Sequence, residues 1–429
     1  MLSTPLPVKP AAIATPTNPL AAMAERFLQV RAHTLALTQT LSAEDQCVQS
    51  MPDASPTKWH LAHTSWFFET VLLQAFAAGY AVFDPKYLYL FNSYYEALGP
   101  RHPRPNRGLL TRPSLAEVHA YRQHIDAAMS GFMAAATATQ WQAAAGLIEL
   151  GLQHEEQHQE LLLTDILHLL SCNPLLPPYQ TLESINGIGK SANAPAKRRT
   201  VAPLQWVAVQ GGIHTVGHAD NGFSFDNETP QHQVLLQPFH IANRLVNCGE
   251  YLDFINDGGY ANAAWWLSDG WAAVQGQSLS APAYWLAPGD PRAPSDQWQI
   301  FGLHGVQPLD RQTPVTQISF YEAVAFAEWS GARLPTEFEW ELAFEMPGIT
   351  QMLGLAWQWT RSSYDPYPGF RPRNGTVREY NGKFMVGQQV LRGASPATPA
   401  GHSRKTYRNF FPPATRWQFS GIRLAKDNP

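Results

Sequence analysis

The chain has 429 residues, more than one hydrophobic core usually organises, which predicts two domains. Hydrophobic residues make up 45% of it, aromatic residues 12% and charged residues only 15%, a composition typical of a globular protein. The formal net charge of -4 excludes a broad cationic surface of the kind that binds a nucleic-acid backbone.

The three cysteines, Cys47, Cys172 and Cys248, are widely separated and odd in number, so they predict neither a disulfide framework nor a zinc site. A reducing cytoplasm is the expected location. Residues 1–20 are rich in proline, alanine and threonine, and we expect a disordered lead rather than a signal peptide. No apolar run is long enough to predict a membrane span.

Residues 21–172 are expected to form a four-helix domain. Apolar residues recur at three- and four-residue spacing over 27–41, 59–76 and 147–170. Ser55, followed by Pro56, is expected to cap one helix, and Ser114 with Glu117 forms a capping box for another. The long connection 79–113 is expected to be ordered and functional, because it is rich in aromatic residues.

Residues 173–200 contain several prolines, two glycines and a basic run, and are expected to form a linker. The composition then changes, with short apolar stretches broken by Gly, Pro, Asn and Asp. This pattern predicts an irregular mixed α+β domain over 201–429, with helices at 319–330 and 336–344. Thr336 and Glu339 match a capping box for the second of these helices.

The strongest chemical signal is the pair His154 and His158, because residues four apart lie one above the other on a helix. The leucines around them indicate a largely buried helix, where two histidines need partners or a metal. A third ligand is expected from His60 or His63, and the apolar neighbours of His63 favour it. Three imidazoles leave coordination positions open, so the pattern allows zinc or iron.

The long connection supplies further candidates. Tyr94 and Tyr95 are placed to donate a proton or an electron beside a metal, although adjacent tyrosines are more often simple packing. Arg101, Arg104 and Arg107 are able to form forked hydrogen bonds to a carboxylate, and a solvated loop is the equally weighted alternative.

Two sets of motifs resemble known families. Ser55-Pro-x-x-Trp-His-Leu-Ala-His63 and His154-Glu-Glu-Gln-His158 resemble the three-histidine iron site of DinB-type helical domains. Arg333-Leu-Pro-Thr-Glu-x-Glu-Trp340, Trp357-Gln-Trp-Thr360 and Gly421-Ile-Arg-Leu424 resemble the formylglycine-generating-enzyme fold, a variant of the C-type lectin fold. Together they resemble the EgtB-type sulfoxide synthases of ergothioneine biosynthesis, which use iron(II) and dioxygen to join a thiol to the imidazole of hercynine (trimethyl-histidine).

The resemblance implies a role for each matching residue. It implies iron ligation by His63, His154 and His158, with Gln157 near the hercynine imidazole. Tyr94 and Tyr95 match the catalytic tyrosines of one branch of the family. The implied substrate contacts are Arg101 and Arg104 for the carboxylate of the thiol, and Asn409 for hercynine, with Phe410 and Phe411 beside it.

Departures from the family leave the donor open. Phe410 and Phe411 replace the Trp-Asp of the actinobacterial branch, so an Asp contact to γ-glutamylcysteine is missing. Residues 354–360 and 391–396 also differ from relatives. The resemblance therefore extends to the selenoneine synthases, which attach selenium from a selenosugar to hercynine.

Two other functions are alternatives. A zinc-loaded site predicts a DinB-type thiol S-transferase, although such transferases do not need the second domain. The C-terminal fold alone suggests a formylglycine-generating or binding module, but formylglycine-generating oxidases use a cysteine pair there and this domain has only Cys248.

Overall fold

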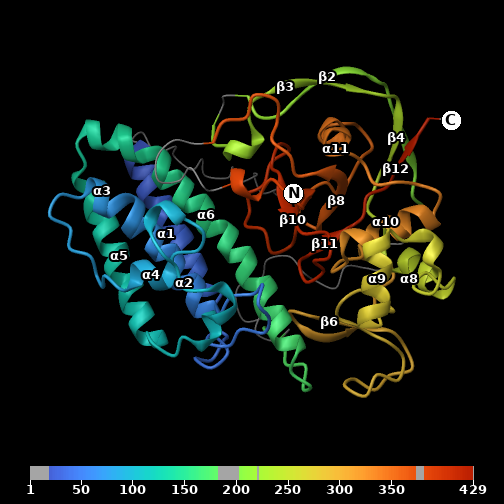
Figure 1. Cartoon of the computed structure of the whole chain (residues 1–429), viewed down its shortest axis with the longest axis horizontal. Coiled ribbons are helices and arrows are strands. Elements are labelled where there is room, and N and C mark those ends of the chain that lie inside the picture. The colour runs from blue at the N-terminus through green and yellow to red at the C-terminus, as the bar shows by residue number, and fades with distance from the viewer. Residues whose placement is uncertain (1–18, 182–201, 220–221, 373–380, 429) are drawn as a thin grey trace, which may run out of the picture.

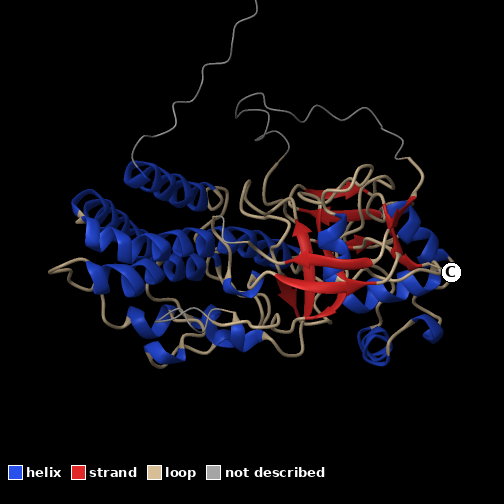
Figure 2. Ribbon diagram, turned by 90° about the horizontal axis from the view of Figure 1, so that it is seen from above, coloured by secondary structure: helices blue, strands red, loops and turns tan. Residues whose placement is uncertain are grey.

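The computed structural model describes residues 19–181, 202–219, 222–372 and 381–428. Helices fill one half of the molecule and the strands lie in the other, as Figures 1 and 2 show. The expected lead lies outside the described residues up to residue 18, and so does the expected linker from residue 182. The α+β class, with a helical domain first, is confirmed.

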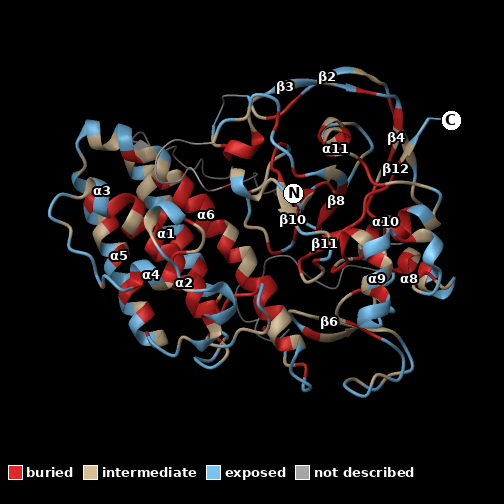
Figure 3. Cartoon of the chain, viewed as in Figure 1, coloured by how far each residue is buried: buried red, intermediate tan, exposed pale blue. Residues whose placement is uncertain are grey.

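Four long helices build the first half: α1 (Pro19–Ala36), α2 (Thr57–Phe67), α5 (Leu115–Ala135) and α6 (Ala138–Ser171). Their apolar faces share one core, which includes Phe67, Ile125 and Leu152. Helix α2 continues through a π-helical segment, Phe68–Leu73, into the short α3 (Gln74–Phe76). Figure 3 shows the buried residues along the inner sides of these helices. Among the described helices, none has the length and apolarity that crossing a membrane requires.

The predicted helix starts are partly right. Ser114 and Glu117 form the capping box of α5, as predicted. The expected Ser55 cap is wrong, because α2 is preceded by Pro56 and lacks a side-chain cap. The Ser55 hydroxyl instead accepts a hydrogen bond from Arg107, 2.9 Å away. The long connection is ordered as expected: it contains α4 (Tyr87–Phe91) and two 3₁₀ helices, Glu96–Leu98 and Arg104–Leu109.

The second half contains short sheets with helices around them. Its first and last strands, β1 (Trp206–Val209) and β12 (Ala425–Asp427), both pair antiparallel with β4 (Phe239–Ala242). A four-stranded sheet has the order β10 (Asn409–Phe411), β9 (Gln389–Ala394), β8 (Ala356–Ser363) and β11 (Ser420–Gly421). The hairpin β2 (Gly212–Val216) with β3 (His232–Leu236), and the sheet β5 (Trp285–Leu286), β6 (Gln299–Gly302) and β7 (Gly305–Pro308), complete the strands.

The second half contains four described α-helices, of which the sequence signals predicted only the last two. They are α8 (Cys248–Asn256), α9 (Ser268–Gln277), α10 (Phe320–Trp329) and α11 (Glu337–Ala343). The last two match the expected helices, and Thr336 and Glu339 form the predicted capping box of α11. Strand β10 carries the three residues of this half that the sequence analysis assigned to the site, Asn409, Phe410 and Phe411.

Helix α6 lies at the border between the two halves (Figure 1). Its Glu160 carboxylate, between the halves, accepts hydrogen bonds from Trp357 Nε1 at 2.6 Å, Ser395 Oγ at 2.6 Å and Thr398 Oγ1 at 2.7 Å. One carboxylate with three neutral donors ties the helix to the strand region. The sequence analysis missed Glu160, because nothing in the local sequence identifies its distant partners.

Candidate active site

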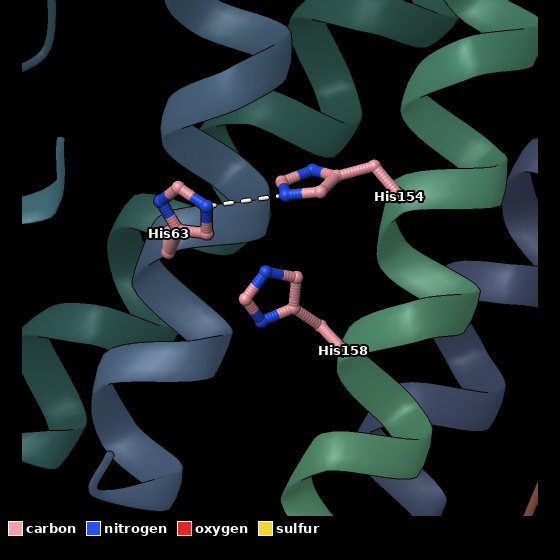
Figure 4. A group of neighbouring side chains, drawn as sticks. All are labelled: His63, His154 and His158. Atoms are coloured by element: carbon pink, nitrogen blue, oxygen red, sulfur yellow. Dashed lines mark hydrogen bonds between the residues drawn. The ribbon is translucent and has the colours of Figure 1, made fainter. Parts of the chain in front are cut away.

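Three histidines converge between α2 and α6. His154 and His158 lie one turn apart on α6, and His63 faces them from α2, as Figure 4 shows. One ring nitrogen of each lies within 4.8 Å of the others. The structure therefore brings together the three residues that the sequence analysis proposed as ligands.

The separations fit one metal ion. Nε2 of His63 lies 3.2 Å from Nε2 of His154. Two nitrogens each about 2.1 Å from one metal, at tetrahedral or octahedral angles, lie about 3.0 to 3.4 Å apart. The spacing of this pair therefore matches two ligands of a shared ion.

The protonation of the histidines also suits a metal. Burial lowers the pKa of His154 to about 3, and lowers the pKa values of His63 and His158 well below the ordinary value. All three rings are therefore neutral near pH 7, and each has a lone pair. His63 Nδ1 lies 2.6 Å from the carbonyl oxygen of Phe91, which can only accept, so the lone pair of His63 is on Nε2.

His60, the alternative third ligand, lies outside this cluster. Its imidazole packs behind His158, with the two Nδ1 atoms 2.8 Å apart. His60 and His63 are three residues apart on one helix, so the packing of α2 against α6 decides which one faces His154.

A cavity of about 320 Å³ opens beside the histidines and is lined by both halves of the chain. His154 and His158 form part of its wall. Most of the predicted site residues also line it, namely Tyr94, Arg104, Gln157, Asn409, Phe410 and Phe411. Arg101 is not among its lining residues and lines a neighbouring cavity instead, and its guanidinium contacts Glu96 at 3.0 Å.

The two tyrosines differ in position. Tyr94 lines the cavity, whereas Tyr95 is wholly buried and packs against Trp66. Their rings stack at 4.6 Å and their hydroxyl oxygens lie 3.5 Å apart. Burial raises the pKa of Tyr94, so its hydroxyl keeps its proton at neutral pH.

Arg107 is a buried arginine of the cavity wall. It is 4% exposed, and its guanidinium stacks on Trp59 at 3.4 Å from the ring centroid. Burial, together with Arg104 and Arg101, lowers its pKa well below the ordinary value. A positive group at this depth suits an anionic part of a substrate.

Tyr407 is a site residue that the sequence analysis missed. Its hydroxyl accepts a hydrogen bond from Gln157 Nε2 at 2.7 Å and lies 3.3 Å from His402 Nε2. It therefore holds the Gln157 side chain from the opposite half of the molecule. Its position two residues before Asn409 is a weak signal, because an isolated tyrosine has no diagnostic spacing.

Phe410 and Phe411 make one wall of the cavity apolar. Phe410 stacks on Tyr364, with ring centroids 4.1 Å apart and planes at 10°, and Phe384 packs near it at 5.9 Å. Phe411 packs edge-on against Trp417 at 6.4 Å. Both side chains stand on β10, which pairs with the central strand β9 and is thereby held in place.

Comparison with protein families assigns both halves. Residues 26–162 match the DinB superfamily, and residues 191–346 and 345–428 match the sulfatase-modifying factor enzyme 1-like domain. These matches agree with the two folds that the sequence motifs indicated.

Two relatives align with nearly the whole chain, and a third aligns with about half of it. Hercynine oxygenase of Mycobacterium tuberculosis is 32% identical over 94% of this chain and 98% of its own length. Hercynine oxygenase of Mycolicibacterium thermoresistibile is 30% identical over 95% of each chain. Ergothioneine biosynthesis protein 1 of Schizosaccharomyces pombe is 26% identical over 48% of this chain and 28% of its own. The chain therefore belongs to the hercynine oxygenase family, the EgtB type that its motifs resemble.

Proposed function

We propose that this protein is an iron(II)- and dioxygen-dependent enzyme that joins a sulfur or selenium donor to the imidazole carbon of hercynine. In this reaction one imidazole C–H bond and one S–H or Se–H bond break, and one C–S or C–Se bond forms. The chalcogen also gains one oxygen atom, giving a sulfoxide or selenoxide. One dioxygen molecule accepts the four electrons, and its second oxygen atom leaves as water.

The observation that carries this proposal is the neutral three-histidine cluster beside a cavity that both domains line. His63, His154 and His158 would hold the ion. Three imidazoles are a ligand set that iron accepts. Bound iron would supply the redox chemistry that dioxygen needs in order to oxidise the donor.

The surrounding residues bind and orient the substrates. Gln157 and Asn409 offer amide groups to the imidazole of hercynine, and Tyr407 fixes the Gln157 amide. Arg104 and Arg107 are placed for an anionic group of the donor. The second domain roofs the cavity and limits the access of water, which protects reactive species from side reactions.

Tyr94 and Tyr95 would act as a pair. Tyr94 reaches the cavity and keeps its proton at neutral pH, and the Tyr95 hydroxyl is close enough to share that proton. A positioned phenol of this kind supplies general acid catalysis.

The apolar wall bears on the choice of donor. Phe410 and Phe411 stand where the actinobacterial branch has Trp-Asp, so the Asp contact to γ-glutamylcysteine is missing from this wall. We propose a donor other than γ-glutamylcysteine, either cysteine or a selenosugar. In the second case the protein would be a selenoneine synthase.

A formylglycine-generating activity has little support in this site. Cys248 is buried and its sulfur contacts Thr313 Oγ1 at 3.5 Å. Burial raises the pKa of Cys248 to about 11, which keeps it as an unreactive thiol at neutral pH.

The test is an aerobic incubation of iron-loaded protein with hercynine and equal amounts of cysteine, γ-glutamylcysteine and a selenosugar. Mass spectrometry should show one adduct equal to hercynine plus donor plus one oxygen minus two hydrogens. With ¹⁸O₂ the adduct should carry one labelled oxygen.

A zinc-dependent thiol S-transferase is the competing function, because the same cluster suits zinc. Zinc-loaded protein that transfers a thiol group without oxygen would support that function. If the iron-loaded protein gives no adduct and takes up no oxygen with any of the three donors, the proposed reaction is wrong.

A further inference from the structure

His60 is a buried histidine that lies beside the three-histidine cluster. The proposed reaction assigns no role to it. It is 3% exposed and lies on α2, one turn before His63. Its Nδ1 is 2.8 Å from His158 Nδ1, and its Nε2 is 3.1 Å from Asp165 Oδ2. Asp165 lies on α6, the helix that carries His158.

His158, His60 and Asp165 form a row of hydrogen bonds, and a backbone hydrogen bond fixes the Asp165 end of this row. The same carboxylate oxygen, Asp165 Oδ2, accepts the backbone N–H of Ser55 at 2.8 Å. Ser55 lies two residues before the first residue of α2, so the Asp165 carboxylate joins the segment that leads into α2 to α6 while it holds His60.

Only one assignment of donors and acceptors in these hydrogen bonds leaves His158 able to bind a metal. A carboxylate only accepts, so the proton of His60 lies on Nε2 and its Nδ1 is an acceptor. The proton of His158 must then lie on Nδ1, which leaves a lone pair on Nε2. That nitrogen is the one that faces His63 and His154 in Figure 4.

The opposite polarity does not suit a metal. If His60 donated from Nδ1, His158 would accept at Nδ1 and carry its proton on Nε2, directed at the other two imidazoles. His60 and Asp165 therefore select the tautomer of His158, as the Phe91 carbonyl selects that of His63.

We propose that His60 and Asp165 are positioning residues, which hold the His158 ring and its tautomer so that Nε2 is presented to the metal. The inference rests on the proposed metal centre. Metal-binding histidines usually donate their second N–H directly to a carboxylate or carbonyl. Here Asp165 lies two turns beyond His158 on the same helix, so His60 from α2 bridges the two.

The test measures binding of Co(II), which reports ligand geometry through its visible spectrum, by competition with a coloured chelator. His60→Leu removes the acceptor, and His60→Asn retains an acceptor near the position of the imidazole Nδ1. Asp165→Asn keeps the row of hydrogen bonds but removes its charge. His168→Leu is the matched control, because His168 lies on α6 and bonds Ser50 Oγ at 2.7 Å without touching the cluster.

We expect His60→Leu to weaken Co(II) binding roughly 10- to 100-fold and to change the visible spectrum. His60→Asn should lower the affinity for Co(II) less than His60→Leu does. Asp165→Asn should lower the affinity for Co(II) a few fold. Adding it to His60→Leu should lower the affinity no further, because Asp165 acts through His60. His168→Leu should bind like the wild type, and thermal unfolding of each metal-free variant checks that it folds.

Wild-type affinity and spectrum in both His60→Leu and Asp165→Asn would overturn the inference. If His60→Leu does not fold, an unchanged spectrum and affinity in both Asp165→Asn and His60→Asn would do so. Losses of affinity in His168→Leu as large as those in the His60 and Asp165 variants would also overturn it. Failure of the wild-type protein to bind Co(II) would overturn the metal centre itself, which is a separate result from unchanged variants.

Discussion

Helix α6 buries polar groups on two sides, and the loss of solvation is offset differently on each side. On one side Glu155 is wholly buried between two arginines, Arg31 at 2.9 Å and Arg122. On the other side His154 and His158 are buried as neutral rings. Although burial raises the pKa of Glu155, Arg122 and Arg31 lower it to about 2, so this carboxylate is charged at neutral pH.

The difference separates a fold-stabilising network from a binding site. The charges around Glu155 compensate one another within the protein and tie α1 and α5 to α6. The imidazoles carry no charge and direct lone pairs at one point, an arrangement that a cation completes. Adjacent residues of one helix should therefore respond to substitution in opposite ways.

The largest expected effect is on the binding side. His154→Ala removes one of three ligands, so iron binding should weaken at least about a hundredfold and product formation should fall to background. Metal analysis and mass spectrometry of the product measure these losses. The metal-free variant loses the packing of a buried ring but leaves no buried charge unpaired, so its unfolding free energy should fall by less than that of Glu155→Gln. An equal fall would show that His154 is part of the structural network.

Glu155→Gln should give the opposite pattern. It leaves Arg31 and Arg122 buried without their carboxylate, so the free energy of unfolding should fall by about 3 to 5 kcal/mol. Denaturant titration measures this. Glu149→Gln is the control, since Glu149 pairs with the half-exposed Arg26 and should change stability by less than about 1 kcal/mol. Equal changes in the free energy of unfolding of Glu155→Gln and Glu149→Gln would contradict the stabilising role assigned to Glu155.

Acid should weaken the network through the same carboxylate. The folded-state pKa of Glu155 is about 2, below its ordinary value near 4.5. Its contribution is therefore fully present above about pH 4.5 and is lost as the pH falls toward 2, to an extent of about 3 kcal/mol. Unfolding measured between pH 6 and pH 2.5 should show a steeper decline for the wild type than for Glu155→Gln. Parallel curves would contradict the assignment.

The tyrosine pair should affect turnover without affecting metal binding. Tyr94→Phe removes the hydroxyl that reaches the cavity and should lower kcat about 10²-fold. Tyr95→Phe should lower it similarly, and the double variant little further, because the two hydroxyls act as a unit. Steady-state oxygen uptake and product analysis measure this. Independent, multiplying losses would argue against a shared proton.

The smallest expected effect is at the contact between the halves. Tyr407→Phe removes the partner of the Gln157 amide, so KM for hercynine should rise about tenfold with a smaller change in kcat, corresponding to one neutral hydrogen bond. Phe225→Leu is a control, because Phe225 also lines the cavity and packs on Tyr407, but its side chain has no hydrogen-bonding group. An equal rise in KM in both variants would indicate loss of packing rather than loss of the hydrogen bond.

Much of the fold could be predicted from the sequence, because the signals that indicate helices and their starts are local. The spacing of His154 and His158, the Ser114 box and the Thr336 box are all readable within one turn of a helix. Ser55 was misread because a distant residue, Arg107, takes its hydroxyl. The choice between His60 and His63 also depended on the packing of two helices.

The contribution of the second domain to the site was the least predictable. Tyr407 and Glu160 gain their roles from partners about 200 or more residues away, and no short pattern records such contacts. Asn409, Phe410 and Phe411 were found through family resemblance rather than through spacing. Their substrate contacts are still predictions.

X-ray absorption at the iron edge of the iron-loaded protein tests the central claim most directly. It should show about three imidazole nitrogens near 2.1 Å from one iron, and fewer in His154→Ala. A spectrum without imidazole scattering, or one that His154→Ala leaves unchanged, would contradict the account.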